Sequence, residues 1–287
     1  MAAHKRWVQA RYIASFLALV AAVATCILYN HLAASSRYGA DETPAPAGME
    51  YANGYCTMTN QSLHCSLYIV AYRALLMKTI SIGLGGTATN VTIPWGGICI
   101  QREAFITVDA GMRRNKAEGL IAVMPSPGAA LELAFNASTL LDLVGKLSGP
   151  QLLSTYTIQV PSGTASSIEL KGVAPSTSTA YYLAVSPLDS RLYGVLHAKL
   201  FIGQETVAWE RAVDGHIGSF IVPLGGVAGV NATSAYSRLI IAYSSGGGID
   251  SAEFTVRLYS SEPLVLGLIL DDGSIVRVSI PVISLGG

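Results

Sequence analysis

Three histidines are the residues of this chain best suited to acid–base chemistry: His64, His197 and His216. Imidazole exchanges a proton near neutral pH, so a histidine beside a carboxylate and a hydroxyl can activate a nucleophile. Asp214 lies two residues before His216, and Ser219 lies three residues after it. A turn followed by a strand explains the same residues, and a triad assembled across the fold stays open. Because HExxH and GxSxG motifs are both absent from the sequence, we expect no catalytic residues, no cofactor and no enzyme.

The cysteines suggest a disulfide or, as an alternative, a metal site. Cys56 and Cys65 enclose eight residues, a spacing that fits a disulfide closing a short loop. Together with His64 they could instead hold a metal, but no fourth ligand has a recognisable spacing. Cys26 lies in an apolar segment and Cys99 in the run Ile-Cys-Ile, so both are expected to be packing residues. The sequence therefore predicts one disulfide and no metal.

Four of the seven asparagines stand in Asn-x-Ser/Thr sequons: Asn60, Asn90, Asn136 and Asn231. Such sequons are acceptors for N-linked glycans on proteins outside the cell. This share exceeds what the Ser and Thr content would give by chance. The sequence thus predicts glycosylation at these four positions.

An uncharged segment near the N-terminus sets the expected location of the chain. Tyr12–Asn30 is nineteen residues without a charge, which as a helix reaches roughly 28 Å, close to the apolar thickness of a bilayer. Lys5, Arg6 and Arg11 precede it, so the N-terminus is expected in the cytoplasm and the chain after about Ser35 outside. The sequence predicts a single-pass membrane protein with an extracellular C-terminal domain.

A cleaved signal peptide is the alternative for the same segment. Ala22-Val23-Ala24 fits the small-x-small pattern of a signal-peptidase site behind a basic region and a short apolar run. The apolar run continues beyond this site, as it does in a retained anchor. Cleavage would leave a secreted protein, so both interpretations place most of the chain outside the cytoplasm.

Composition limits the partners. Charged residues make up 13% of the 287 residues, about half the usual share. Three of the eighteen basic residues precede the apolar segment, which leaves fifteen basic and eighteen acidic residues in the remainder. That part has too little positive charge to follow a phosphate backbone, so no nucleic acid is expected. So few charges suit a surface that packs against copies of itself or carries sugar.

Apolar runs broken by turn residues predict a strand-rich fold. Between Thr155 and Ile283 ten such runs recur every 8 to 14 residues, and Asp271-Asp272-Gly273-Ser274 marks a last hairpin. This spacing favours an antiparallel β-sandwich or jelly roll. Asn136–Leu147 predicts the one helix outside the apolar segment, with Asn136 or Ser138 as its cap.

These features predict five segments. They are a cytoplasmic basic tail (1–11), a transmembrane helix or signal segment (12–34), a flexible stalk (35–50), a β-rich subdomain with one helix at 136–147 (51–150), and an antiparallel β-sandwich (151–287). The layout, an N-terminal apolar helix followed by a weakly charged, sequon-bearing β-domain, resembles prokaryotic surface proteins, especially filament and envelope subunits of archaea.

Two functions are compatible with this layout. The first is a cell-surface structural or interaction protein that assembles with copies of itself or an envelope protein, with Ala33–Met49 completing a neighbour's sheet. The alternative is an anchored domain that binds a carbohydrate or another small ligand, which would need a concave polar site with aromatic residues.

Overall fold

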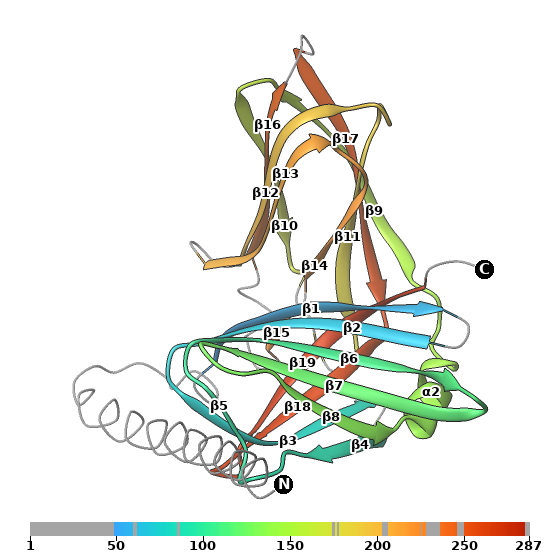
Figure 1. Cartoon of the computed structure of the whole chain (residues 1–287). Helices are drawn as coiled ribbons and strands as arrows, with labels where there is room; N and C mark the ends of the chain where they lie inside the picture. Colours follow the sequence, from blue (N-terminus) through green and yellow to red (C-terminus); the bar gives the residue numbers. More distant parts are fainter. Residues whose placement is uncertain are drawn as a thin grey trace, which may run out of the picture.

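The computed structural model is built almost entirely of β-strands (Figure 1). It describes residues 49–59, 62–84, 87–173, 176, 178–202, 206–224, 226–227, 236–245 and 250–284. The predicted tail, membrane or signal segment and all but the last two residues of the stalk lie outside these ranges. Within the ranges, no helix has the length and apolar character to cross a membrane. The mainly β fold class is confirmed.

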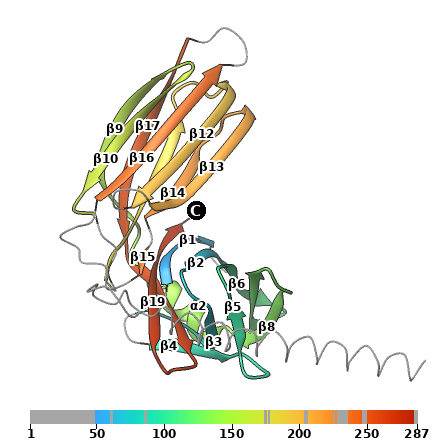
Figure 2. The same cartoon turned by 90° about the vertical axis from the view of Figure 1, so that its left-hand side faces the viewer.

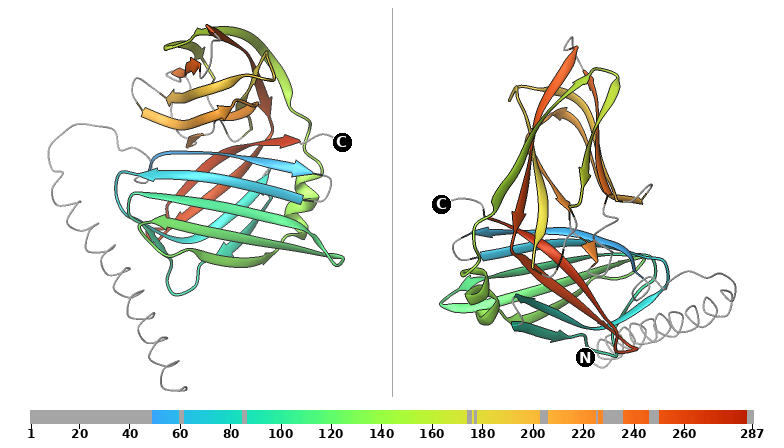
Figure 3. Two further views of the ribbon diagram at one scale, coloured as in Figure 1. Left: turned by 45° about the horizontal axis from the view of Figure 1, so that its top comes forward. Right: turned by 180° about the vertical axis from the view of Figure 1, so that it is seen from behind.

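The larger unit is an 11-stranded sheet that curves around its own core (Figure 3). In order across the sheet its main strands are β4 (Thr87–Thr92), β3 (Leu75–Leu84), β18 (Pro263–Leu270), β19 (Ile275–Ser284), β1 (Met49–Thr59), β2 (Ser62–Ala71), β6 (Glu103–Arg113), β7 (Lys116–Ser126) and β8 (Leu131–Asn136). The short β5 (Ile98–Ile100) pairs with β3, and β15 (Gly226–Val227) pairs with β19. The curvature makes the sheet barrel-like.

Apolar side chains alternate with more polar or exposed ones along these strands, so the sheet has one buried face. In β2, Leu63, Cys65, Leu67 and Ile69 point into the core, while the residues between them are half-buried or exposed. This period of two is the pattern of a strand with one buried face. The strands β6 and β7 alternate in the same way.

One helix, α2 (Ser138–Val144), is described, and it packs into the core of the large sheet. It contacts β3 and β4 near one edge of the sheet and β7 near the other. The predicted helix 136–147 is too long, because Asn136 ends β8 and Gly145 caps the helix. The N-cap residue is Ala137, without a side-chain capping hydrogen bond, so the prediction of Asn136 or Ser138 as the cap is wrong. The Asn136 side-chain oxygen accepts a hydrogen bond from the Ser138 amide at 2.9 Å, which forms a turn just before the helix.

The smaller unit is a sandwich of two four-stranded sheets (Figure 2). One sheet has the order β10 (Thr164–Lys171), β16 (Tyr236–Ser245), β12 (Tyr193–Ile202) and β13 (Thr206–His216), and the other β14 (Phe220–Leu224), β11 (Ala180–Pro187), β17 (Ser251–Ser261) and β9 (Gln151–Pro161). The second hydrophobic core, which includes Phe254, Leu196 and Tyr243, lies between them.

The end of the chain returns to the large sheet. The hairpin of β18 and β19 forms at the predicted turn and inserts between β3 and β1. The strand β19 pairs with β1 in parallel, so the prediction of a purely antiparallel fold is wrong at this position. The division at residue 150 stays a prediction, and the topology groups residues 263–284 with the segment before it.

Asn53 of β1 joins the large sheet to the sandwich. Its side chain is 3% exposed and donates hydrogen bonds to the carbonyls of Ala208 at 3.2 Å and Pro223 at 2.9 Å. Ala208 lies on β13 and Pro223 on β14, the edge strands of the two sandwich sheets. One amide therefore holds both sandwich sheets against β1.

We predict that Asn53→Ala lowers the free energy of unfolding by about 2–3 kcal/mol, because two buried carbonyls lose their donor. Urea denaturation measures this loss. The matched control is Gln159→Ala at an exposed position of β9, which should change stability by less than about 0.5 kcal/mol. Equal effects of the two substitutions would contradict the role of Asn53.

Candidate functional site

The predicted disulfide between Cys56 and Cys65 is confirmed. The two residues lie opposite each other on β1 and β2, and their sulfur atoms are 2.09 Å apart. The bond removes both thiolates, so the alternative of a metal site with His64 is wrong. Among the residues that the structure describes, no three His, Cys, Asp or Glu side chains converge on a possible metal position. Since disulfides persist in oxidising compartments, this one indicates an extracellular or secreted protein.

Two predicted glycosylation positions can be located. Asn90 is exposed on β4, and Asn136 is exposed where β8 meets α2. Asn60 and Asn231 fall outside the described ranges. Cys26 does as well. Cys99 lies half-buried on β5 and is disulfide-bonded, so the expectation that it is only a packing residue is wrong. Glycosylation of the four asparagines stays a prediction.

The residues Asp214, His216 and Ser219 do not form a catalytic group. The His216 ring pairs with the Ser190 carbonyl at 2.8 Å, and the Ser219 hydroxyl donates to the hydroxyl of Ser186 at 3.0 Å. The hydroxyl of Ser219 is therefore directed away from the histidine. Asp214 and His216 lie at the end of β13, and Ser219 lies in the short connection before β14, so the simpler prediction, a turn followed by a strand, is also wrong in its order.

A different histidine has an acidic partner. His64 Nδ1 lies 2.6 Å from Asp109 Oδ1, and both side chains are about half exposed on the outer face of β2 and β6. The two residues are 45 positions apart, so no spacing in the sequence points to them. Only the pairing of β2 with β6 places them side by side.

A groove crosses the outer face of β4, β3, β18 and β19. Its volume is about 590 Å³. The pairing of the four strands puts Asn90, Ser81, Gly267 and Arg277 in one row, with Gly267 near the middle. A Cβ on Gly267 would lie 3.2 Å from the Ser81 Cβ and would fill the bottom of the groove. Glycine at this position leaves that space empty of side-chain atoms. Apolar side chains, Val265 on one side and Ile269 and Ile275 on the other, complete the lining.

The groove opens at β4, which is an edge of the large sheet. This six-residue strand, Thr-Ala-Thr-Asn-Val-Thr, has neither a charge nor a proline. The edge strands β8, β10 and β13 carry charged residues, and β14 and β9 contain proline. Charge and proline are the usual protections of a sheet edge against pairing with another chain. Among the strands that the structure describes, none lies beside β4 on its outer side, so this edge is available for such pairing.

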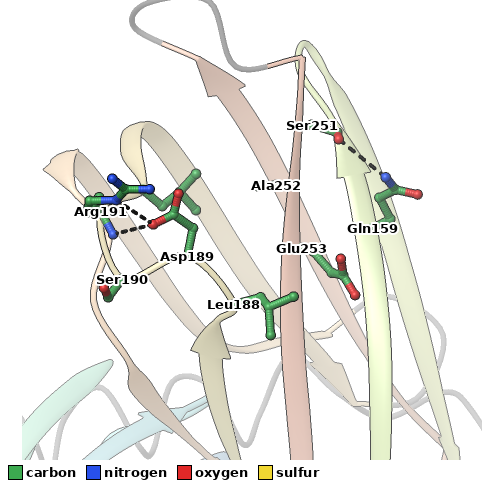
Figure 4. Close-up of a pocket in the computed structure, with 9 residues that line it drawn as sticks. Gln159, Leu188, Asp189, Ser190, Arg191, Ser251, Ala252 and Glu253 are labelled. Carbon is green, nitrogen blue, oxygen red and sulfur yellow. Dashed lines mark hydrogen bonds and ion pairs between the residues drawn. The ribbon is translucent and has the colours of Figure 1, made fainter.

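A second hollow of about 510 Å³ lies on the sandwich (Figure 4). Asp189 Oδ1 accepts hydrogen bonds from the Arg191 amide at 2.9 Å and from Arg191 Nε at 3.3 Å, and these bonds lower the pKa of Asp189. On the other side of β17, Gln159 donates to Ser251 at 3.3 Å. Because these polar side chains pair with one another, the hollow is a weaker candidate than the groove.

No family model and no curated protein matches this chain. Among solved structures, similar ones include the secreted serine protease VesC from Vibrio cholerae, with 10% identity, a TM-score of 0.23, and coverage of 70% of this chain and 47% of the protease. A structure of the Gx strain of infectious bursal disease virus has 13% identity, a TM-score of 0.22, and coverage of 83% and 65%. A carbohydrate-binding module of the β-sandwich superfamily has 10% identity, a TM-score of 0.20, and coverage of 82% and 99%. The chain thus spans about half of the protease and just under two thirds of the viral chain.

The comparison corrects one prediction. The absence of motifs predicted that the chain is not an enzyme, and the likeness to a secreted serine protease contradicts this. The prediction is withdrawn. A TM-score of 0.23 carries no argument for protease activity in this chain.

We predict that replacing Cys56 and Cys65 together by alanine lowers the free energy of unfolding by about 2–3 kcal/mol, because the unfolded chain loses the constraint on its loop. Chemical denaturation measures the change. Thr59→Ala in the same hairpin is the control, and its exposed side chain predicts a change below about 0.5 kcal/mol. Unchanged stability of the double variant would show that the bond adds nothing to the fold.

Proposed function

We propose that the protein is an extracytoplasmic surface subunit that assembles with copies of itself into a filament or envelope layer. The observation that carries this proposal is the open edge at β4, which has no charge or proline and adjoins a groove with polar and apolar lining residues. An unpaired strand edge presents backbone N–H and C=O groups to any extended segment that reaches it. Strand addition would satisfy these groups between neighbouring subunits.

The groove supports a particular arrangement of the added strand. Side chains of a strand beside β4 alternate between the two faces of the sheet. Those on the outer face would lie next to Ala88 and Asn90, at the open end of the groove, so this arrangement applies to subunits without a glycan on Asn90. The apolar Val265 and Leu84 extend this surface, so burial of apolar side chains would add to the backbone hydrogen bonds.

The donor in this proposal is the segment 33–48 of a neighbouring subunit. Fully extended, these residues span about 50 Å, more than twice the roughly 20 Å of a six-residue strand. The donor can therefore cover β4 and still leave a linker before β1. The low share of charged residues, 13%, is compatible with close packing of subunits. The segment 12–34 would hold the subunit in the membrane or be removed as a signal, and an envelope protein could take the place of the second copy.

We predict that Ala88→Lys on β4 raises the protein concentration needed for assembly by about tenfold, the equivalent of 1.4 kcal/mol per contact, because a charge at the edge opposes strand addition. Sedimentation velocity and negative-stain microscopy measure the assembly.

Ala134→Lys is the matched control, since Ala134 is an exposed alanine on the other edge strand, β8. It should assemble like the original protein. A second variant that lacks residues 33–48 tests the donor. Normal assembly of the deletion variant would show that residues 33–48 are not the donated strand. Equal assembly of the two lysine variants would show that β4 is not the accepting edge.

A further inference from the structure

The outer face of β2, β6 and β7 presents its side chains in rows that run across the strands. These strands lie in front of β18 and β19 in Figure 1. Their pairing defines one row of large side chains, Tyr68, Phe105 and Met124. A second row, His64, Asp109 and Leu120, crosses β2 four residues before Tyr68. Between them lies a row of small side chains, Ser66, Thr107 and Ala122.

The first row, called the aromatic row, joins two aromatic rings to a methionine, and two of its three side chains are exposed. Phe105 is 50% exposed and Met124 is 38% exposed. The rings of Tyr68 and Phe105 have centroids 4.7 Å apart, and Tyr51 packs edge-on against Tyr68 at 6.0 Å. Since such large apolar side chains are usually buried, an exposed group of them indicates a binding surface.

Polar groups hold this aromatic row in place and surround it. The Tyr68 hydroxyl donates a hydrogen bond to Glu103. Burial, and after it this bond, raises the pKa of Tyr68 above its ordinary value, so the hydroxyl stays protonated. The second row adds the His64–Asp109 pair, and the middle row adds the hydroxyls of Ser66 and Thr107. The surface therefore combines aromatic rings with carboxylate and hydroxyl groups.

We infer that this face, defined by the three rows, binds a neutral saccharide chain that lies across the strands. The C–H faces of a sugar ring pack on aromatic rings, and its hydroxyls bond to carboxylates and to other hydroxyls. On β2 and β6, which lie about 4.8 Å apart, the rows give both kinds of contact side by side, and β7 adds apolar side chains beside them. This site is separate from β4, so it does not depend on the proposed assembly.

The charges on the face favour a neutral saccharide over other partners. Glu103 and Asp109 lie at or beside the three rows, whereas the basic Arg113 and Lys116 lie at the far hairpin end of β6 and β7, next to Glu118. The carboxylates nearest the rows would repel a phosphate or an acidic polymer. A second copy of the chain would bring the same carboxylates. The hydroxyl row between the aromatic and His–Asp rows suits a ligand rich in hydroxyl groups.

The test is isothermal titration of the full-length protein with four neutral hexasaccharides: cellohexaose, maltohexaose, mannohexaose and chitohexaose. We expect saturable binding to at least one of them. Phe105→Ala should weaken this binding by about tenfold or more, since stacked rings at the centre of a site carry much of its affinity. Asp109→Asn should weaken it as well, because the carboxylate acceptor is lost.

Tyr193→Ala is the matched control, because Tyr193 is an aromatic residue on the sandwich that is 60% exposed. It should bind as the original protein does, and circular dichroism should show all variants folded. Failure of all four saccharides to bind, or equal affinity of Phe105→Ala and the original protein, would overturn the proposal. If no saccharide binds and Phe105→Ala changes the sedimentation coefficient, the face is instead a contact with a second copy of the chain, and the proposal is wrong.

Discussion

The buried amide of Asn53 is the contact on which the arrangement of the two units depends. It reaches from the middle of the large sheet to the edge strands of both sandwich sheets, and it bonds to one carbonyl on each. A buried carbonyl without a donor costs free energy, so the two sandwich sheets and β1 are constrained together. The hydroxyl of Ser279 on β19 adds a second link, to the carbonyl of Ser176. Contact with the sandwich also explains the burial pattern of β19. Exposed and buried side chains alternate in its first four residues, and residues 279–283 are buried on both faces of the sheet.

This constraint leaves two faces of the large sheet available. Where the sandwich covers β1 and the second half of β19, outward side chains such as Pro281 are buried. On one side of this cover lie β18, β3 and the open edge at β4. On the other side lie β2, β6 and β7 with the exposed aromatic row. The position of the sandwich thus separates an edge suited to strand addition from a face suited to a saccharide.

Much of the local structure could be predicted from the sequence, because strand periodicity and turn residues are local signals. The apolar runs gave the strands after residue 150, Asp271–Ser274 marked the last hairpin, and the spacing of Cys56 and Cys65 predicted their disulfide. The neighbours of each strand could not be predicted. A period of two tells which side chains share a face, but it does not tell which strands pair. The parallel contact of β1 with β19, the His64–Asp109 pair and the groove around Gly267 all depend on that pairing.

The most direct test of assembly through the open edge is hydrogen–deuterium exchange on dispersed and assembled protein. Strand addition would protect the backbone amides of residues 87–92 in the assembled sample and leave those of β8 unchanged, because only the first edge gains a partner. Equal exchange of residues 87–92 in the two samples would contradict the account.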